Sequence, residues 1–333
     1  MRPRVAIIYN EPTWCSYNAA GEEKAVHGVL GEVMAVYRAL IELGYPVVRV
    51  PLSPPLEQAR KSLEQLKTDL VFNLFEGFCG YPKTEAAMAD ILSELGLIYT
   101  GCHSSVLSLA LSKAKVKAVW QKTGIDTPAY QLLSPETLPQ FDLRYPCIVK
   151  PCEEDASHGV LEESVVYDFA TLGKQVSQVS KRFGGEVLVE EFVEGREVSA
   201  AILGAKKPIV LPLSEIAYSL PPGWPRILTF SAKWESQSMY FYGTKTICPA
   251  DIEMNTQRHI NDIALSVFRM LGCSGYARVD FRLDSRGSPR VLEVNPNPDI
   301  SPDAGLAHQA QAAGIVYNQL IEKIAMLALR EVS

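Results

Sequence analysis

The chain has 333 residues, of which 47% are hydrophobic and 21% charged, as is ordinary for a globular protein of two or three domains. Its net charge is −6, and it has no basic blocks or basic, aromatic-interleaved stripes, which argues against nucleic-acid binding. No apolar run approaches the roughly 18 residues of a membrane span, and the seven cysteines lack CxxC spacing, so we expect a cytoplasmic protein with free thiols and no membrane association.

The first 112 residues alternate predicted strands with predicted helices, which is typical of βαβ units around a parallel sheet. Ligands of such sheets bind beyond the carboxyl ends of the strands, where Asn10, Glu11, Asn73 and Glu76 fall. Residues 1–112 are therefore predicted to form an N-terminal substrate domain. In chain order, the expected elements are strand 5–9, helix 32–43, strand 47–50, helix 56–66, strand 69–73 and helix 85–95.

Residues 113–189 are predicted to form a central domain. Lys150 ends a short strand and meets a loop of small and polar residues, where its ammonium group and backbone N–H groups would suit a phosphate. An exposed lysine before a proline turn is the alternative interpretation, and for Lys150 alone it is favoured. The expected elements are a helix at 111–120, a strand at 145–151, a strand beginning at Val160 and a helix at 168–183.

Residues 190–333 are predicted to form the third domain, in which strands come first and helices flank them, so the α/β pattern becomes α+β in this half. A loop at 220–233 is rich in proline and glycine, and long loops inside compact domains are often functional. The expected elements are strands at 187–193, 198–203 and 209–212, a helix at 256–271, a hairpin at 275–295 and a helix at 315–329.

The hairpin carries the most informative pattern. Asp280 lies in its first apolar segment, and Glu293 and Asn295, two residues apart, lie in its second. Residues two apart on a strand face the same side, so the three side chains are expected to converge as oxygen ligands for Mg²⁺ that also holds nucleotide phosphates. Solvated surface residues are the alternative. It is disfavoured because the carboxylates lie within apolar runs, and a buried carboxylate needs a partner; Arg278 shares the face of Asp280.

The common nucleotide-binding, hydrolase and zinc motifs are absent from the sequence. What remains is a set of charged residues along the chain. Glu190 and Glu191 end a strand at a domain boundary, where adenine is often held by backbone groups; Glu197 would suit ribose hydroxyls and Lys233 a γ-phosphate. A charged strand edge is the alternative for the three glutamates. Among the five histidines, only His158 stands out, because it lies in the loop after Lys150.

The order of Lys113, the segment 149–151 with its small-residue loop, the segments 187–191 and 232–233, and the hairpin resembles the ATP-grasp superfamily, in particular D-alanine–D-alanine ligase and related carboxylate–amine ligases. The resemblance spans nearly the whole chain. It implies three domains, with an N-terminal parallel sheet and with nucleotide bound between the central and C-terminal domains. Relatives of this family are often dimers, which leaves a homodimer open.

The resemblance also implies roles for individual residues. Lys113 and Lys150 would contact the ATP phosphates, and the loop with Ser157 would cover them. Glu190, Glu191 and Val193 would contact adenine, and Glu197 the ribose. Lys233 would approach the γ-phosphate, and Arg278 would stabilise charge on an acyl phosphate. Asp280, Glu293 and Asn295 would hold two Mg²⁺ ions, or Mn²⁺ in their place. The small-molecule substrates would be a carboxylate and an amine, joined as ADP forms.

The sequence departs from this family at the substrate end. Asp299 stands where a glycine is expected and Ala304 where a serine is expected; a carboxylate there favours a cationic acceptor. Phe75-Glu76-Gly77 replaces a His-Gly loop, and residues 10–12 with Glu22 and Glu23 replace an N-terminal Ser-Glu-x-Glu pattern. Two alternatives stay open: a strict D-alanine–D-alanine ligase of cell-wall synthesis, and an ATP-binding regulatory module without ligase activity. The substrate contacts are assigned to Glu11, Glu76 and Asp299.

Overall fold

The computed structural model describes residues 2–11, 22–78, 81–154 and 157–331. Its N-terminal part is a parallel sheet of three strands in the order β2-β1-β3. All six residues of β1 are buried, as is typical of parallel strands covered on both faces. The elements are β1 (Val5–Asn10), α1 (Glu22–Glu42), β2 (Val47–Leu52), α2 (Leu56–Glu64), β3 (Leu70–Asn73) and α3 (Lys83–Glu94).

Two helices, α4 (Ser104–Leu111) and α5 (Lys113–Thr123), lead into an antiparallel sheet of the order β4-β7-β5-β6. Its apolar face packs against α6, which begins after Asp168; the side chain of Asp168 accepts a hydrogen bond from the backbone N–H of Thr171 at 2.8 Å. The elements are β4 (Tyr130–Leu133), β5 (Cys147–Pro151), β6 (Val165–Val166), α6 (Phe169–Phe183) and β7 (Val187–Glu191).

The C-terminal sheet has the order β11-β10-β8-β12-β13, and β9 pairs with β8. Successive residues of β8 face opposite sides: Ala200 and Ile202 pack in the cluster that contains α9, whereas Ala201 and Leu203 pack in the cluster that contains α10 and α11. The strands are β8 (Arg196–Gly204), β9 (Ile209–Val210), β10 (Ser214–Tyr218), β11 (Thr244–Ile247), β12 (Gly275–Leu283) and β13 (Pro289–Asn295). The helices are α7 (Phe230–Trp234), α8 (Met239–Gly243), α9 (Met254–Leu271), α10 (Gly305–Ala312) and α11 (Tyr317–Glu331).

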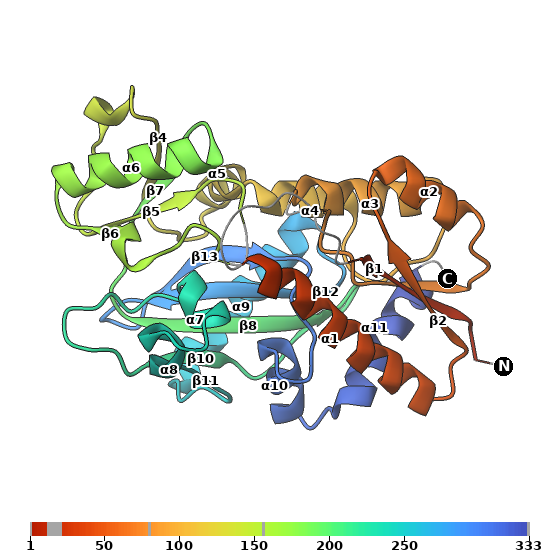
Figure 1. Cartoon of the computed structure of the whole chain (residues 1–333). Helices are drawn as coiled ribbons and strands as arrows, with labels where there is room; N and C mark the ends of the chain where they lie inside the picture. Colours follow the sequence, from red (N-terminus) through yellow and green to blue (C-terminus); the bar gives the residue numbers. More distant parts are fainter. Residues whose placement is uncertain (1, 12–21, 79–80, 155–156, 332–333) are drawn as a thin grey trace.

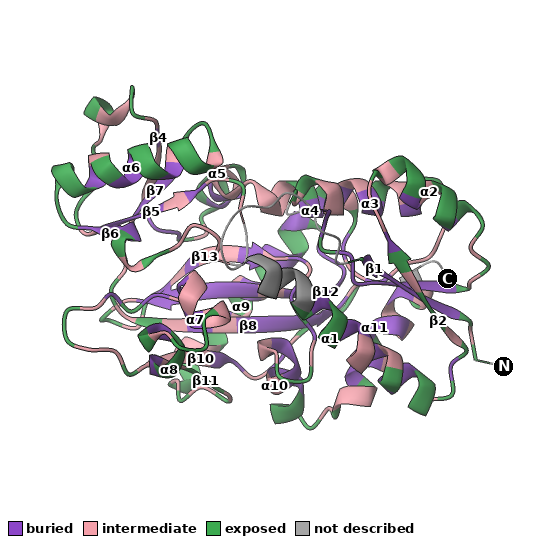
Figure 2. Cartoon of the chain, in the orientation of Figure 1, coloured by how far each residue is buried: buried purple, intermediate pink, exposed green. Residues whose placement is uncertain are grey.

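The chain returns at its C-terminal end to the first sheet. Figure 1 shows α11 near α1, and both helices belong to the core cluster that also contains β1 and part of β8. Figure 2 shows β8 and β12 buried within the molecule and the outer faces of α2 and α6 exposed. The N-terminal and C-terminal sheets are thus joined by shared apolar packing.

Among the described residues, no single helix combines the length and apolar character that a membrane crossing requires. Within the described ranges, one pair of helices, α10 and α11, meets that requirement by length and composition when the two are taken together across a bend of 104°.

The predicted βαβ alternation and the C-terminal hairpin agree with the structure. Some predicted ends are shifted: α1 begins at Glu22 and not at residue 32, and β7 ends at Glu191 and not at residue 193. Three further predictions differ from the structure in kind. The helix at 111–120 is divided between α4 and α5 at Ser112, whose ψ of 85° is not helical. No strand begins at Val160; a 3₁₀ turn at Glu162–Ser164 precedes the two-residue β6. The loop at 220–233 ends in α7, where Thr229 caps the helix by accepting a hydrogen bond from Ala232.

Candidate functional site

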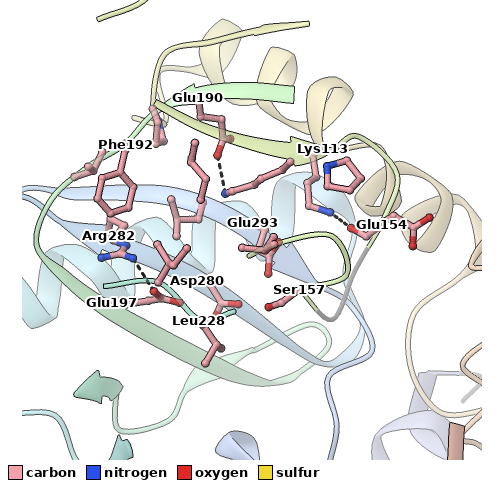
Figure 3. Close-up of a pocket in the computed structure, with 18 of the residues that line it drawn as sticks. Lys113, Glu154, Ser157, Glu190, Phe192, Glu197, Leu228, Asp280, Arg282 and Glu293 are labelled. Carbon is pink, nitrogen blue, oxygen red and sulfur yellow. Dashed lines mark hydrogen bonds and ion pairs between the residues drawn. The ribbon is translucent and has the colours of Figure 1, made fainter. Parts of the chain in front are cut away.

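One pocket lies between the four-stranded and six-stranded antiparallel sheets, and Figure 3 shows the side chains that face it. It collects residues from β5, β7, β8, α7, β12 and β13 and from the loop after β5. The predicted site residues that line it are Lys113, Lys150, Ser157, Glu190, Glu191, Val193, Glu197, Lys233, Arg278, Asp280 and Glu293. The predicted residues outside its lining are Asn295, Glu11, Glu76 and Asp299.

The inner end of the pocket holds a buried chain of charges. Glu190 lies between two lysines: one carboxylate oxygen is 2.6 Å from Lys117 Nζ and the other is 2.7 Å from Lys150 Nζ. Burial raises the pKa of Glu190, but the two ammonium groups outweigh it and lower the pKa to about 2. Lys117 also donates to Thr127 Oγ1 at 2.6 Å. The charged carboxylate of Glu190 therefore fixes the direction in which Lys150 enters the pocket.

Sequence reasoning did not find Lys117. It lies four residues after Lys113 on α5, so the two lysines occupy the same side of one helix. Its side chain is fully buried beside Trp120, which a lysine tolerates only with a charge partner. The sequence shows a lysine among the apolar residues of a predicted helix, which indicates a buried charge. It does not show the partner, because Glu190 is distant along the chain.

The backbone that follows β7 offers a hydrogen-bond donor to the pocket. The N–H groups of Glu191 and Phe192 donate to backbone carbonyls at 2.9 and 2.8 Å. The N–H of Val193 makes no hydrogen bond within the part of the chain that the structure describes. The carboxylate of Glu191 accepts from the backbone N–H of Arg144 at 3.2 Å. Such a segment suits a planar heterocycle through its backbone, as predicted for adenine.

Glu197 is fixed by two neighbours on the floor of the pocket. Its Oε2 accepts from the hydroxyl of Tyr218 at 2.7 Å and lies 3.0 Å from Arg282 Nη2, a contact drawn in Figure 3. Arg282 itself is buried and was missed from the sequence, although it follows Arg278 and Asp280 at two-residue spacing on the same strand face. The alternation of charged residues along β12 was the signal that would have found it.

Asp280 and Glu293 lie directly opposite each other on the paired strands β12 and β13. Asp280 also accepts from Arg278 Nε at 2.8 Å and from Ser199 Oγ at 2.7 Å. Burial raises the pKa of Asp280, but Arg278 outweighs it and holds the pKa below its usual value. Two adjacent carboxylates, at least one of them strongly held in its charged form, therefore face the pocket.

Asn295 follows Glu293 by two residues on β13, and its Oδ1 accepts from the backbone N–H of Asn297 at 2.9 Å. Across the described ranges, no group of three or more His, Cys, Asp or Glu residues could hold a metal ion. Two carboxylates and an amide fit a magnesium ion that takes its other ligands from nucleotide phosphates and water. The donor set fits a metal that arrives with the nucleotide.

The loop after β5 covers one side of the pocket. The ammonium group of Lys113 donates to the backbone carbonyl of Glu154, as drawn in Figure 3. Ser157 has a left-handed backbone, with φ of 64°, and its carbonyl accepts from the N–H of Val160 at 3.0 Å. Lys233, on α7, lies close enough to lower the pKa of Asp280. The predicted phosphate-binding residues thus surround one volume.

The predicted substrate residues lie where the N-terminal sheet meets the C-terminal domain. Glu11 follows β1 and accepts from Ser53 Oγ at 2.7 Å. The backbone N–H of Glu76 donates to Asn10 Oδ1 at 3.1 Å. Asp299 accepts from Ser301, through its backbone N–H at 2.7 Å and its hydroxyl at 2.6 Å.

A fourth carboxylate, that of Glu32 on α1, lies in this region. Glu32 was not predicted as a site residue from the sequence. It is buried and accepts from the backbone N–H of Ile300 at 2.8 Å. Burial, together with Glu76 and Asp299, raises its pKa well above the usual value. Glu32 lies three residues after Val29 on the apolar side of α1. An acidic residue within an apolar helical stripe could have indicated this buried carboxylate from the sequence.

Part of the N-terminal departure from the family pattern cannot be placed. Pro12 lies outside the described residues, as do the side chains of Glu22 and Glu23.

Comparison with known proteins identifies the family. A family model described as the C-terminus of D-ala D-ala ligase matches residues 119–326. The D-alanine–D-alanine ligase of Carboxydothermus hydrogenoformans is 31% identical over 305 residues, which cover 89% of this chain and 91% of that protein. This chain belongs to the D-alanine–D-alanine ligase family.

Two further known proteins are similar to this chain. The uncharacterized protein y4sG of Sinorhizobium fredii is 35% identical over 279 residues, 83% of this chain and 78% of that protein. The crystal structure of the Bacillus anthracis D-alanine–D-alanine ligase complexed with ATP has a TM-score of 0.73 at 22% identity and covers 99% of this chain and 98% of its own. Membership of the D-alanine–D-alanine ligase family confirms the predicted ATP-grasp architecture and a ligase-like protein of the ATP-dependent class.

Proposed function

We propose that this protein is an ATP- and Mg²⁺-dependent ligase that joins a carboxylate to an amine through an acyl phosphate, releasing ADP. One observation carries the proposal. The pocket between the two antiparallel sheets gathers lysines from three separate segments, Arg278, and a facing pair of carboxylates. A magnesium-bound triphosphate requires this combination, because the lysines and Arg278 would face the phosphates and the carboxylate pair would bind the magnesium ion.

Each end of the nucleotide has a matching part of the pocket. The backbone at Val193 would donate to adenine, and Glu197 would accept from ribose hydroxyls. Lys113, Lys150 and Lys233 would face the phosphates, where fixed positive charge stabilises the transfer of a phosphoryl group without a protein nucleophile. The ion pair with Glu190 supports this role for Lys150, since it holds the ammonium group in place before ATP binds.

Asp280, Glu293 and Asn295 would hold the metal ions. A bound magnesium ion would neutralise charge on the phosphates, and its remaining ligands would be phosphate oxygens and water. Arg278 contacts Asp280 and faces the same pocket, so its guanidinium would stabilise charge that develops on the acyl phosphate.

The reaction balances with two substrates. A carboxylate oxygen of the first substrate attacks the γ-phosphorus and ADP leaves. The amine of the second substrate then attacks the acyl carbon, inorganic phosphate leaves, and the amine nitrogen loses a proton. Because water would compete with the amine at the acyl phosphate, the reacting groups must be shielded from solvent.

The acceptor is proposed to be a cationic amine, such as a diamine or a basic amino acid amide. Asp299 stands where the family has glycine, and Glu32 lies within hydrogen-bonding reach of it. Negative charge at this place repels a carboxylate and attracts an ammonium group.

A screen for phosphate release tests the function. Purified protein with ATP and Mg²⁺ is incubated with pools of amino acids, diamines and dipeptides, and inorganic phosphate is measured. Phosphate release is expected only when a carboxylate and an amine acceptor are both present. Glu293→Ala and Lys150→Ala should each lower the rate by about a hundredfold or more, since each removes charge stabilisation of the transferred group.

Lys61→Ala is the matched control, because Lys61 lies exposed on α2, where it forms a surface ion pair with Glu57. Unchanged ligation in Glu293→Ala or Lys150→Ala would contradict their assignment. Turnover with D-alanine alone at millimolar concentration would favour a strict D-alanine–D-alanine ligase. ATP binding without phosphate release throughout a broad screen would favour a regulatory nucleotide-binding module.

A further inference from the structure

His158 lies in the wall of the nucleotide pocket with one ring nitrogen unused. The atom Nε2 is buried, and within the described chain it has no hydrogen-bond partner. The opposite nitrogen, Nδ1, lies 3.7 Å from the carboxylate of Glu154. Leaving a buried polar atom unsatisfied costs free energy comparable to a lost hydrogen bond, so such an atom beside a pocket indicates a missing ligand.

The backbone on both sides of His158 is constrained. Ser157 and Gly159 have left-handed backbones, with φ of 64° and 73°. At Gly159 a Cβ atom would lie 2.7 Å from side-chain atoms of Phe183 and Pro151, so a larger residue cannot be accommodated without displacement. The turn formed by these residues directs His158 toward the pocket.

The loop is also tied to the helix that carries Lys233. The backbone N–H of Phe230, the first residue of α7, donates to the carbonyl of Val160 at 3.1 Å. The ring of Phe230 lies 5.6 Å from the ring of His158, measured between centroids. His158 and Lys233 are therefore held on adjoining segments, and both line the pocket.

The surrounding charge indicates the kind of ligand. The lining of the pocket includes the cations Lys113, Lys150, Lys233 and Arg278, which suit phosphate oxygens, and carboxylates such as Asp280 and Glu293, which suit the accompanying Mg²⁺. An imidazole N–H donates readily to a phosphate oxygen. We propose that His158 is a further phosphate-contacting residue, whose Nε2–H donates to a phosphate of ATP bound in this pocket. This inference rests on the proposed function.

A purely structural role is the competing explanation, in which His158 serves only to contact Glu154 through Nδ1. Two substitutions separate the roles, because the amide nitrogen of asparagine occupies the place of Nδ1 and that of glutamine the place of Nε2. His158→Asn keeps a polar group on the side of Glu154 and loses the nitrogen at the Nε2 position. His158→Gln keeps a donor at the Nε2 position.

The experiment measures the dissociation constant of ATP with Mg²⁺ by calorimetry for the full chain and for His158→Leu, His158→Asn and His158→Gln. We expect the leucine and asparagine variants to bind ATP about tenfold or more weakly, the effect of losing a hydrogen bond to a charged group, and the glutamine variant to keep most of the affinity. Adenosine, measured by its displacement of ATP, should bind all variants as it binds the wild type.

His259→Leu is the matched control, since His259 is exposed on α9, away from the pocket lining. Wild-type affinity for ATP in His158→Asn, or a loss in His158→Gln as large as in His158→Leu, would overturn the inference while leaving the proposed function intact. A folded wild-type protein that binds no ATP would overturn both. Far-UV circular dichroism and thermal unfolding confirm that each variant is folded.

Discussion

Glu190 is a carboxylate buried between two ammonium groups, and its charge is what allows those groups to be buried. Lys117 and Glu190 are each about 1% exposed, whereas Lys150 is 17% exposed toward the pocket. Burial lowers the pKa of Lys117 below its ordinary value, and Glu190 offsets only part of that effect. Glu190, Lys117 and Lys150 together carry two positive charges and one negative charge. Removing the carboxylate would therefore leave both ammonium groups without a counter-charge.

The charges of Glu190, Lys117 and Lys150 predict which of two variants, Glu190→Gln or Lys117→Met, is the less stable. Glu190→Gln leaves the buried ammonium group of Lys117 and the partly buried one of Lys150 without their carboxylate, and it should lower the free energy of unfolding by about 3 kcal/mol or more. Lys117→Met should cost less, because a neutral pair of Glu190 and Lys150 remains. Urea unfolding at pH 7 measures both, and a larger loss for Lys117→Met would contradict the argument.

The ion pairs of Glu190 with Lys117 and Lys150 also predict how the stability of the protein depends on pH. The pKa of Glu190 is lowered to about 2 in the folded protein, against an ordinary value near 4.5. Its stabilisation is therefore present above the unfolded value and is lost as the pH falls through the folded value. The difference in stability between the wild type and Lys117→Met should shrink as the pH falls from about 4.5 to about 2.

At the scale of elements, strand alternation was the part of the sequence that predicted the site best. The side-chain period of two is local, so Asp280 could be assigned a face without knowledge of the rest of the fold. The register that sets Asp280 opposite Glu293 agrees with that expectation. The roles of these residues in metal binding remain predictions.

Elements that depend on distant neighbours could not be predicted in this way. β10 is a five-residue strand containing Ser214 and Glu215, and it is a strand because it pairs with β8 and β11. Its polar residues look like loop residues until those partners are known. The same holds for β11, an edge strand whose four residues are partly exposed.

The turn between β7 and β8 gives a prediction at this scale. Gly195 has φ of 150°, and a Cβ atom there would lie 1.8 Å from the carbonyl oxygen of Leu283. Gly195→Ala should lower the free energy of unfolding by about 2 kcal/mol, because the backbone of β12 must move. Gly31→Ala, with no atom within 4 Å of the new Cβ, is the control. It should raise stability by about 0.5–1 kcal/mol, as alanine does inside a helix. Equal effects in thermal or urea unfolding would contradict this account.

At the scale of the whole molecule, a single apolar core connects the two ends of the chain. Val5 and Leu40 of the N-terminal part share one cluster with Leu203 of β8 and with Leu320 and Ile324 of α11. The final helix was predictable from its amphipathic pattern, but the surface that it covers was not, because a periodic pattern shows which face is buried and not against what.

The same long-range packing brings three acidic residues together. Glu32 comes from α1, Glu76 from the segment after β3 and Asp299 from the segment after β13. The sequence indicated Glu76 and Asp299 separately, but only the fold brings Glu32 to them. The pKa of Glu32 is raised by burial and by both neighbours, so these groups are close enough to influence one another.

Under the proposed function, Asp299 is the residue whose substitution tests which acceptor charge is preferred. Asp299→Asn removes its charge and keeps an oxygen to accept from Ser301. Repulsion of an acceptor carboxylate then weakens, so the ratio of kcat/KM for amino acids with a free carboxylate to kcat/KM for cationic amines without one should rise by about tenfold or more. Asp303→Asn, four residues further on and exposed, serves as the control. Steady-state phosphate release with paired acceptors, such as a diamine and the amino acid of the same length, measures the ratio. An acceptor profile that stays unchanged while the variant retains full activity would show that Asp299 does not select the acceptor.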